Sequence, residues 1–189
     1  MTYLANALSL LIQFAFGCAI LLFVFRLLAE AVRADFYNPI CQFLYRATNP
    51  VLTPLRRVVP TWRRINIAAL LIAWVLEVIK NFLIGLVAPD FWASNVGVLV
   101  LALADLLDFF LIAYLIMIFA WALLSYVNVE ARNPVVPLLG KIVEPILKPF
   151  RRILPLIGGF DLSPVLAILV ILLIQTVVVA WLMNTGHTI

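Results

Sequence analysis

Charged and catalytically useful side chains are scarce in this chain of 189 residues. Only 12% of the residues are charged, against about 25% in a typical soluble domain. There is a single histidine, His187, and there are only two cysteines. The sequence also lacks a Gly-rich phosphate loop, the Cys/His spacing of a metal site and a nucleophile–base set. We therefore expect a protein that is not an enzyme and that needs no cofactor or metal.

Apolar residues are abundant instead, and they are gathered into four long runs. They make up 66% of the chain, whereas a soluble domain has roughly 45–50%. A membrane-spanning helix needs about 20 consecutive apolar residues. The runs cover residues 3–29, 67–88, 96–124 and 162–183. This pattern predicts an all-α membrane protein with four transmembrane helices.

The basic residues lie between the first and second runs and between the third and fourth. The segments 30–65 and 125–161 hold eleven lysines and arginines, whereas the N-terminus, the 89–95 turn and the C-terminal tail hold none. Basic loops usually stay in the cytoplasm. We therefore expect a multi-pass protein of the bacterial inner membrane, with both basic loops cytoplasmic and both termini outside.

A basic phrase punctuated by prolines occurs twice, at an offset of 95 residues. Residues 49–60 read NPVLTPLRRVVP and residues 144–155 read EPILKPFRRILP, and nine of the 23 positions 38–60 are identical to their counterparts. The phrases indicate two tandem repeats, residues 1–92 and 93–189, each made of a helix, a basic loop and a helix. An even number of crossings separates the repeats, so both insert in the same direction around a pseudo-two-fold axis along the membrane normal. The repeated motif comprises Asn38, Pro39, Pro50, Pro54, Arg56, Arg57 and Pro60, with Asn133, Pro134, Pro145, Pro149, Arg151, Arg152 and Pro155 as counterparts.

Each basic loop contains apolar residues at helical spacing and is longer than structureless loops usually are. Asn38 and Asn133 are suited to cap the start of a helix, and a proline follows each of them. We therefore expect each loop to form a short amphipathic helix that lies in the membrane interface.

The prolines of the phrase are expected to interrupt these helices, because proline lacks an N–H and its ring clashes with the carbonyl four residues earlier. The first proline stops one helix or starts the next, and the second leaves no room for a long regular helix. The third ends the phrase before the chain re-enters the bilayer. The three positions are Pro50, Pro54 and Pro60 in the first repeat and Pro145, Pro149 and Pro155 in the second.

The double arginine of each phrase, Arg56–Arg57 and Arg151–Arg152, is expected at the level of the lipid headgroups. There it can bind anionic lipid phosphates, which is worth about 1 kcal/mol per basic residue. Two interpretations stay open: the arginines set the topology and anchor the protein to lipid, or they form a docking surface for a cytosolic or membrane protein. Nucleic acid is not an expected partner, because no aromatic–basic platform accompanies the arginines.

Ionisable residues also interrupt the apolar runs, and charges inside a membrane are costly enough to be candidates for function. They can form a buried structural ion pair or lie at the interface, they can pass an ion or a proton, or they can contact a partner. A further pair, Arg26 and Glu30, lies four residues apart at the end of the first run and is expected to stabilise that helix end. The residues that interrupt the runs are Glu77, Lys80, Asp105 and Asp108.

The repeat offset suggests one specific ion pair inside the membrane. It maps Gln13 onto Asp108 and Lys80 onto Gln175. Pseudo-two-fold packing would place the third run beside the second and the first beside the fourth. We therefore hypothesise that Lys80 pairs with Asp108, with Glu77 one turn away as a second partner.

The phrases DFYNPICQFLYRATNPVLTPLRRVVP and NPVVPLLGKIVEPILKPFRRILPLIGGFDLSP resemble the two copies of the YggT/YlmG family repeat. The second copy keeps the family ending GGFDLSP, which contains Asp161, whereas the first has Asn66 at that position. The resemblance implies a small integral membrane protein tied to cell division or membrane-complex organisation. It also implies, for some bacterial members, a link to osmotic or envelope stress and ion uptake, and it brings no established reaction.

Two functions therefore remain as hypotheses. One is a non-enzymatic scaffold or assembly factor that works through the basic loops. The other is a small ion-handling membrane protein that works through the buried charges and, because four helices enclose little pore, requires a homo-oligomer. Charge reversal in the loops, compared with neutralisation of the buried charges, distinguishes the two.

Overall fold

The computed structural model describes residues 2–57, 59, 65–88, 94–126, 133–153 and 161–189, and the regular elements of this part of the chain are helices. Four helices are long and apolar enough to cross a membrane, which confirms the four spans predicted from the sequence. Three are α1 (Thr2–Ala31), α3 (Ile67–Val87) and α4 (Asn95–Tyr126). The fourth is continuous from α6 (Ser163–Ile174) through a five-residue π-helical segment, Gln175–Val179, to α7 (Ala180–Thr188).

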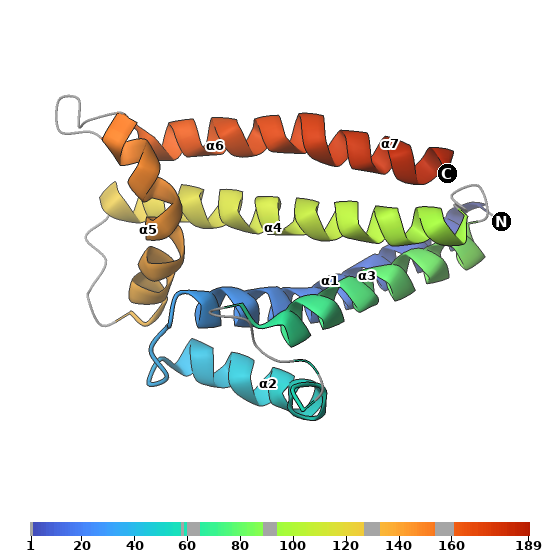
Figure 1. The fold of residues 1–189 in the computed structure, drawn as a ribbon, viewed down its shortest axis with the longest axis horizontal. Coiled ribbons are helices and arrows are strands. Elements are labelled where there is room, and N and C mark those ends of the chain that lie inside the picture. Colours follow the sequence, from blue (N-terminus) through green and yellow to red (C-terminus); the bar gives the residue numbers. More distant parts are fainter. Residues whose placement is uncertain (1, 58, 60–64, 89–93, 127–132, 154–160) are drawn as a thin grey trace.

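Two shorter helices, α2 (Pro39–Leu55) and α5 (Val135–Ile153), lie toward the opposite end of the bundle from the two chain termini (Figure 1). We call the end with α2 and α5 the basic end and the other the terminal end. Both termini share one end because the chain crosses the bundle four times. This is the arrangement expected for two helix–loop–helix repeats that insert in the same direction.

The spans pack mainly as neighbours along the chain. Helix α1 lies against α3 in the first repeat, α4 lies against α6 and α7 in the second, and α3 joins α4 across the repeats. The expected proximity of the second and third spans is therefore confirmed. The expected packing of the first span on the fourth is wrong, because α1 packs chiefly on α3 whereas α6 and α7 pack on α4.

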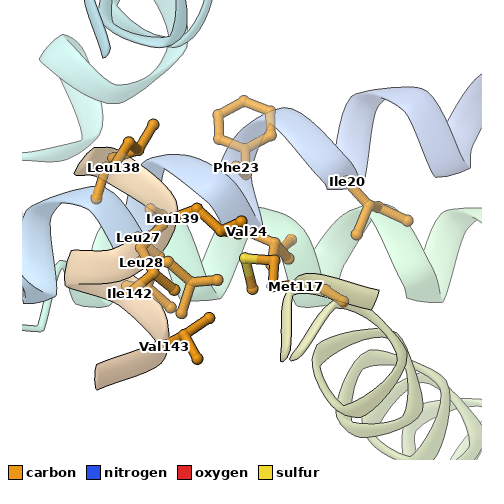
Figure 2. Packing of buried hydrophobic residues seen from close by; sticks show 14 of the residues in the cluster. Ile20, Phe23, Val24, Leu27, Leu28, Met117, Leu138, Leu139, Ile142 and Val143 are labelled. Carbon is orange, nitrogen blue, oxygen red and sulfur yellow. The ribbon is translucent and has the colours of Figure 1, made fainter. Parts of the chain in front are cut away.

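The buried core is concentrated at the basic end, where it joins the two repeats. Figure 2 shows apolar side chains of α1 facing those of α5, with one methionine of α4 beside them. Helix α5 belongs to the second repeat by sequence, yet it packs against the first span of the first repeat. It therefore bridges the repeats. The labelled members of this core are Ile20, Phe23, Val24, Leu27, Leu28, Met117, Leu138, Leu139, Ile142 and Val143.

The asparagines of the repeated motif cap the amphipathic helices as predicted. The Asn38 side-chain oxygen accepts the N–H of Ile40 at 2.9 Å, and that of Asn133 accepts the N–H of Val135 at 3.0 Å. In addition, the Asn38 amide donates to the Pro134 carbonyl at 2.6 Å. The starts of α2 and α5, 96 residues apart in the chain, are thereby joined directly.

The prolines of the phrase do not interrupt α2 or α5, so that expectation is wrong. Each helix runs through two prolines that lie four residues apart and are exposed. Residues four apart lie on one face of a helix, so both proline rings are on the outer face. The carbonyls that lose a hydrogen bond to proline also face outward there, and the helix can bend. The opposite face stays regular and packs. The prolines inside the helices are Pro50, Pro54, Pro145 and Pro149. The third prolines, Pro60 and Pro155, lie outside the described residues.

The two amphipathic helices lie differently relative to the spans. Helix α5 crosses the ends of α4 and α6, as expected for an interfacial helix, whereas α2 runs alongside α1 (Figure 1). The repeats therefore share a sequence pattern and an element order but differ in how the amphipathic helix is placed.

Candidate functional site

A buried arginine on α1 organises the basic end of the first repeat. Arg26 is 0% exposed, and its guanidinium carbon lies 3.1 Å from the ring centroid of Tyr45 on α2. Its Nη2 lies 2.8 Å from Oε1 of Glu30 and 3.3 Å from Oδ1 of Asn49. The predicted Arg26–Glu30 ion pair is confirmed, and a cation over an aromatic face contributes about 2 kcal/mol when it is desolvated. The cluster fixes the middle of α2 to α1.

Glu30 joins three helices of the first repeat. Besides Arg26, it accepts from Nη2 of Arg56, at the end of α2, at 2.6 Å and from Nδ2 of Asn66 at 2.8 Å. The side-chain oxygen of Asn66 in turn accepts the N–H of Ala69 at 3.2 Å, which caps α3. One carboxylate therefore connects the end of α1, the end of α2 and the start of α3.

In the second repeat, Arg151 is held by two carboxylates. Its Nε lies 2.8 Å from Asp161 Oδ2, and its Nη1 lies 2.8 Å from Glu144 Oε1. Asp161 Oδ1 accepts the N–H of Ser163 at 2.9 Å, so Asp161 also binds the first turn of α6. Burial alone would raise the pKa of Asp161, but its hydrogen bonds with Ser163 and Arg151 outweigh burial and lower that pKa. Burial acts to lower the pKa of Arg151, and the carboxylates of Asp161 and Glu144 outweigh it and raise that pKa.

The two repeats therefore build one kind of contact from different residues. We call this contact the arginine clamp. In each repeat it consists of the first arginine of the double arginine, its carboxylate partners, and the residue that binds the first turn of that repeat's second span. The repeat offset aligns Arg56 with Arg151 and Asn66 with Asp161. Where the cap is a neutral asparagine, Glu30 of α1 supplies the carboxylate, so the departure of the first copy from the family ending is compensated.

The double arginines divide into a clamped member and an exposed member. Arg56 and Arg151 belong to the clamps, whereas Arg57 and Arg152 are exposed and form no ion pair with any described residue. The sequence contains a signal for this division, because each clamped arginine lies four residues after a buried leucine and so falls on the packed face. The prediction that the four arginines act as one set does not include this division. Contact with lipid or a partner stays a prediction, and it now concerns Arg57 and Arg152.

A second cluster of charges lies between α3 and α4, away from the basic end. Lys80 forms an ion pair with Glu77 and lies 3.2 Å from Asp105 Oδ2, which also accepts from Nδ2 of Asn81 at 2.9 Å. Glu77 is 1% exposed. The expected Lys80–Glu77 contact is confirmed. The opposing charges balance one another in part, as buried charges require.

The hypothesised Lys80–Asp108 pair is wrong. Asp108 instead accepts from Nε2 of Gln175 at 2.8 Å, at the start of the π-helical segment. The stagger of α3 against α4 explains this pairing. Lys80 lies seven residues before the end of α3, whereas Asp105 lies ten residues and Asp108 thirteen residues after the start of α4. At about 1.5 Å per residue, Asp105 is the carboxylate nearer to the level of Lys80.

A cavity of about 140 Å³ adjoins this cluster toward the terminal end. Its polar lining residues are Asn81, Asp105 and His187, and Met183 completes the wall on α7. In the part of the chain that the structure describes, no three His, Cys, Asp or Glu side chains meet in a way that could hold a metal ion. The cavity brings the single histidine near an intramembrane carboxylate, which the sequence analysis did not anticipate.

Comparisons with known proteins agree with this architecture. The profile of the CCB3/YggT family matches twice, over residues 4–87 and 100–182. An uncharacterized protein of Vibrio alginolyticus is 38% identical over 166 residues, covering 84% of this chain and 85% of that protein. The uncharacterized protein YggT of Escherichia coli (strain K12) is 31% identical over 185 residues, covering 96% of this chain and 94% of that protein. No solved structure matches the chain.

Proposed function

This chain belongs to the CCB3/YggT family, and from that membership and its structure we propose that it is a non-enzymatic scaffold or assembly factor of the bacterial inner membrane. We place both basic loops in the cytoplasm, from the distribution of lysine and arginine. The working face is the basic end, and the partner is a cytosolic or membrane protein with an acidic surface. Cell division or membrane-complex organisation is the setting that the family resemblance suggests.

The division of the double arginines carries this proposal. The clamps fix Arg56 and Arg151 to their repeats, and each fixed arginine is followed by an exposed one. Because α5 packs against α1 and the Asn38 amide joins the start of α2 to the start of α5, the two exposed cations belong to one connected framework. Two fixed charges of one sign favour an acidic partner and fix its orientation.

Photo-crosslinking in intact membranes tests the scaffold function. A photoreactive residue replaces Thr53 in one variant and Lys148 in another, since these exposed positions are equivalent in the two repeats and lie one turn before Arg57 and Arg152. We expect both variants to capture one and the same protein, and we expect charge reversal at Arg57 and Arg152 to abolish capture. A crosslinker at the exposed, span-located Trp181 is the control. Adducts with lipid alone at both positions contradict the proposal.

A specific observation favours ion handling as the second candidate. Asp105 borders a cavity of about 140 Å³ that also contacts His187, so a polar space adjoins the intramembrane charges. In this alternative, neutralising Lys80 and Asp105 together abolishes an osmotic-tolerance phenotype while crosslinking at the basic end persists. The scaffold function requires the reverse, that charge reversal at Arg57 and Arg152 causes the phenotype.

A further inference from the structure

A groove opens between the second half of α2 and the first turns of α3. Its walls are Val51, Pro54 and Leu55 on α2 and Leu71, Ile72 and Val75 on α3. Its volume is about 560 Å³, within the range of about 300–1,000 Å³ typical of ligand pockets. Helix α2 packs chiefly on α1 and only slightly on α3, so a space remains between α2 and α3.

The groove can accept only an apolar ligand, and it is open to the outside of the bundle. Every residue named in its walls is apolar. Val51 is 49% exposed and Val75 is 42% exposed, so the two walls can be reached from the side of the protein. The α3 wall lies four to eight residues into a membrane span, where the surrounding solvent is lipid hydrocarbon. An acyl chain is the apolar ligand that this position offers.

Among the residues that the structure describes, an exposed cation, Arg57, follows the α2 wall of the groove. Arg57 follows Pro54 by one turn, and its backbone N–H donates to the Pro54 carbonyl at 3.3 Å. Its side chain is exposed and pairs with no described carboxylate, whereas the adjacent Arg56 is bound to Glu30. A positive charge beside a groove that accepts an acyl chain is complementary to an anionic lipid headgroup.

The second repeat covers the equivalent face with its own residues. The offset aligns Ile72 with Ala167 and Leu76 with Ile171. Ala167 is 1% exposed and Ile171 is 6% exposed, whereas Ile72 and Leu76 are only half-buried. The open groove is therefore a feature of the first repeat, where α2 runs alongside the spans.

We propose that this groove is a phospholipid-binding site, in which one acyl chain of an anionic phospholipid lies between α2 and α3 and its phosphate meets Arg57. The ligand is a whole phospholipid, because the groove and the cation together require a long chain joined to an anionic head. The site goes beyond the scaffold function but shares Arg57 with it, so the groove substitutions below, which leave Arg57 in place, test the lipid site separately.

Native mass spectrometry of the full chain in detergent, titrated with phosphatidylglycerol or with phosphatidylcholine of the same acyl chains, tests the site. Val75→Trp fills the groove and should weaken the first lipid-binding event by about tenfold, the equivalent of about two methylene groups leaving the groove. Val51→Trp fills it from the other wall and should act alike. Arg57→Gln should leave phosphatidylcholine binding unchanged and reduce the preference for phosphatidylglycerol by about fivefold.

Matched substitutions in the second repeat are the controls. Val165→Trp places the same bulk on an exposed position of α6, and Arg152→Gln removes the arginine equivalent to Arg57. Both should bind the first phosphatidylglycerol as the unmodified chain does. If both groove variants bind like the unmodified chain, or if Val165→Trp weakens binding equally, the groove is not the site. If Arg57→Gln and Arg152→Gln behave alike, the phosphate does not meet Arg57.

Discussion

Trp121 on α4 lies against Gly140 on α5, and a Cβ atom on that glycine would come within 2.8 Å of the tryptophan ring. The repeat offset makes these residues the counterparts of Arg26 and Tyr45, which stack on each other in the first repeat. The same two positions therefore join a span to an amphipathic helix in both repeats. A cation lies over a ring in one repeat, and a ring lies over a glycine in the other. The absence of a side chain at Gly140 lets α5 approach α4 closely.

Gly140→Ala should destabilise the folded chain. Overpacking costs about 1–3 kcal/mol, and the gain in helix propensity over glycine recovers at most about 1 kcal/mol. In a Trp121→Phe background the ring is shorter and the clash is relieved, so the same substitution should become stabilising. Unfolding free energies in detergent measure both effects. A destabilisation of equal size in the two backgrounds contradicts the contact.

Lys80→Met should be the most damaging single substitution in the intramembrane cluster, because it leaves Glu77 and Asp105 without their shared cation. Loss of one member of a buried pair costs about 3–5 kcal/mol. Asp105→Asn should cost less, since Lys80 keeps Glu77 and Asn81 keeps a hydrogen-bond acceptor.

Double-mutant cycles of unfolding free energy identify the partner of Lys80. The cycle of Lys80→Met with Asp105→Asn should show strong coupling. The cycle of Lys80→Met with Asp108→Leu should be additive within about 0.5 kcal/mol, because Asp108 binds Gln175 instead. Coupling in the second cycle and none in the first would restore the Lys80–Asp108 pair.

Asp161→Asn should reduce the loss of stability in acid. The fold lowers the pKa of Asp161 from its ordinary value of 3.8, so the carboxylate stabilises the folded chain above that pH. This stabilisation is lost as the pH falls through the lower pKa of the folded state. As the pH falls from about 5 to about 2, the thermal midpoint should fall more steeply for the unmodified chain than for the variant. Parallel curves contradict the clamp.

The reciprocal change, Asn66→Asp, is the matched control for the clamp. It replaces an amide that donates to Glu30 at 2.8 Å with a second carboxylate. The two like charges should repel, so this variant should be less stable than the unmodified chain at pH 7. Its midpoint should recover in part as acid protonates the pair. A variant as stable as the unmodified chain at pH 7 would show that Glu30 and Asn66 are not in contact.

The two members of each double arginine should respond differently to removal of charge. Arg56→Gln or Arg151→Gln breaks a clamp and should lower the thermal midpoint. Arg57→Gln or Arg152→Gln should stay within about 0.5 kcal/mol of the unmodified chain, as is usual for exposed positions. Equal losses at adjacent arginines would contradict the division.

Reporter fusions test the orientation in the membrane. A fusion after Ile189 should be active only with a reporter that works outside the cytoplasm, because the lysines and arginines concentrate in the two loops at the other end of the bundle. A reporter that works only in the cytoplasm should be silent there. Activity of the cytoplasmic reporter at that position would show that the orientation is the reverse of the predicted one.

Features set by local pattern were predictable from the sequence. The length of the apolar runs gave the four spans, and Asn38 and Asn133 gave the caps. Features that depend on packing were not. The partner of Lys80 depends on how α3 and α4 are staggered, and repeat equivalence aligns positions without showing which of them touch. Helices α2 and α5 continue through their prolines because the prolines lie on the helix face that does not pack against the spans, and packing decides which face that is. The leucine four residues before Arg56 indicates in the sequence which arginine turns inward, but only the folded bundle shows that its partner there is Glu30.

The Asn38–Pro134 hydrogen bond joins the two copies in one direction, from the first to the second. Two separate copies around a two-fold axis must present identical surfaces to each other, so a substitution in one is always a substitution in both. Duplication within a single chain removes that requirement. Each copy can then accumulate changes that its twin would not tolerate, such as the Arg26–Tyr45 stack where the other copy has Trp121 and Gly140. The tandem arrangement thus allows two copies of one unit to become unlike halves, which selection can shape independently.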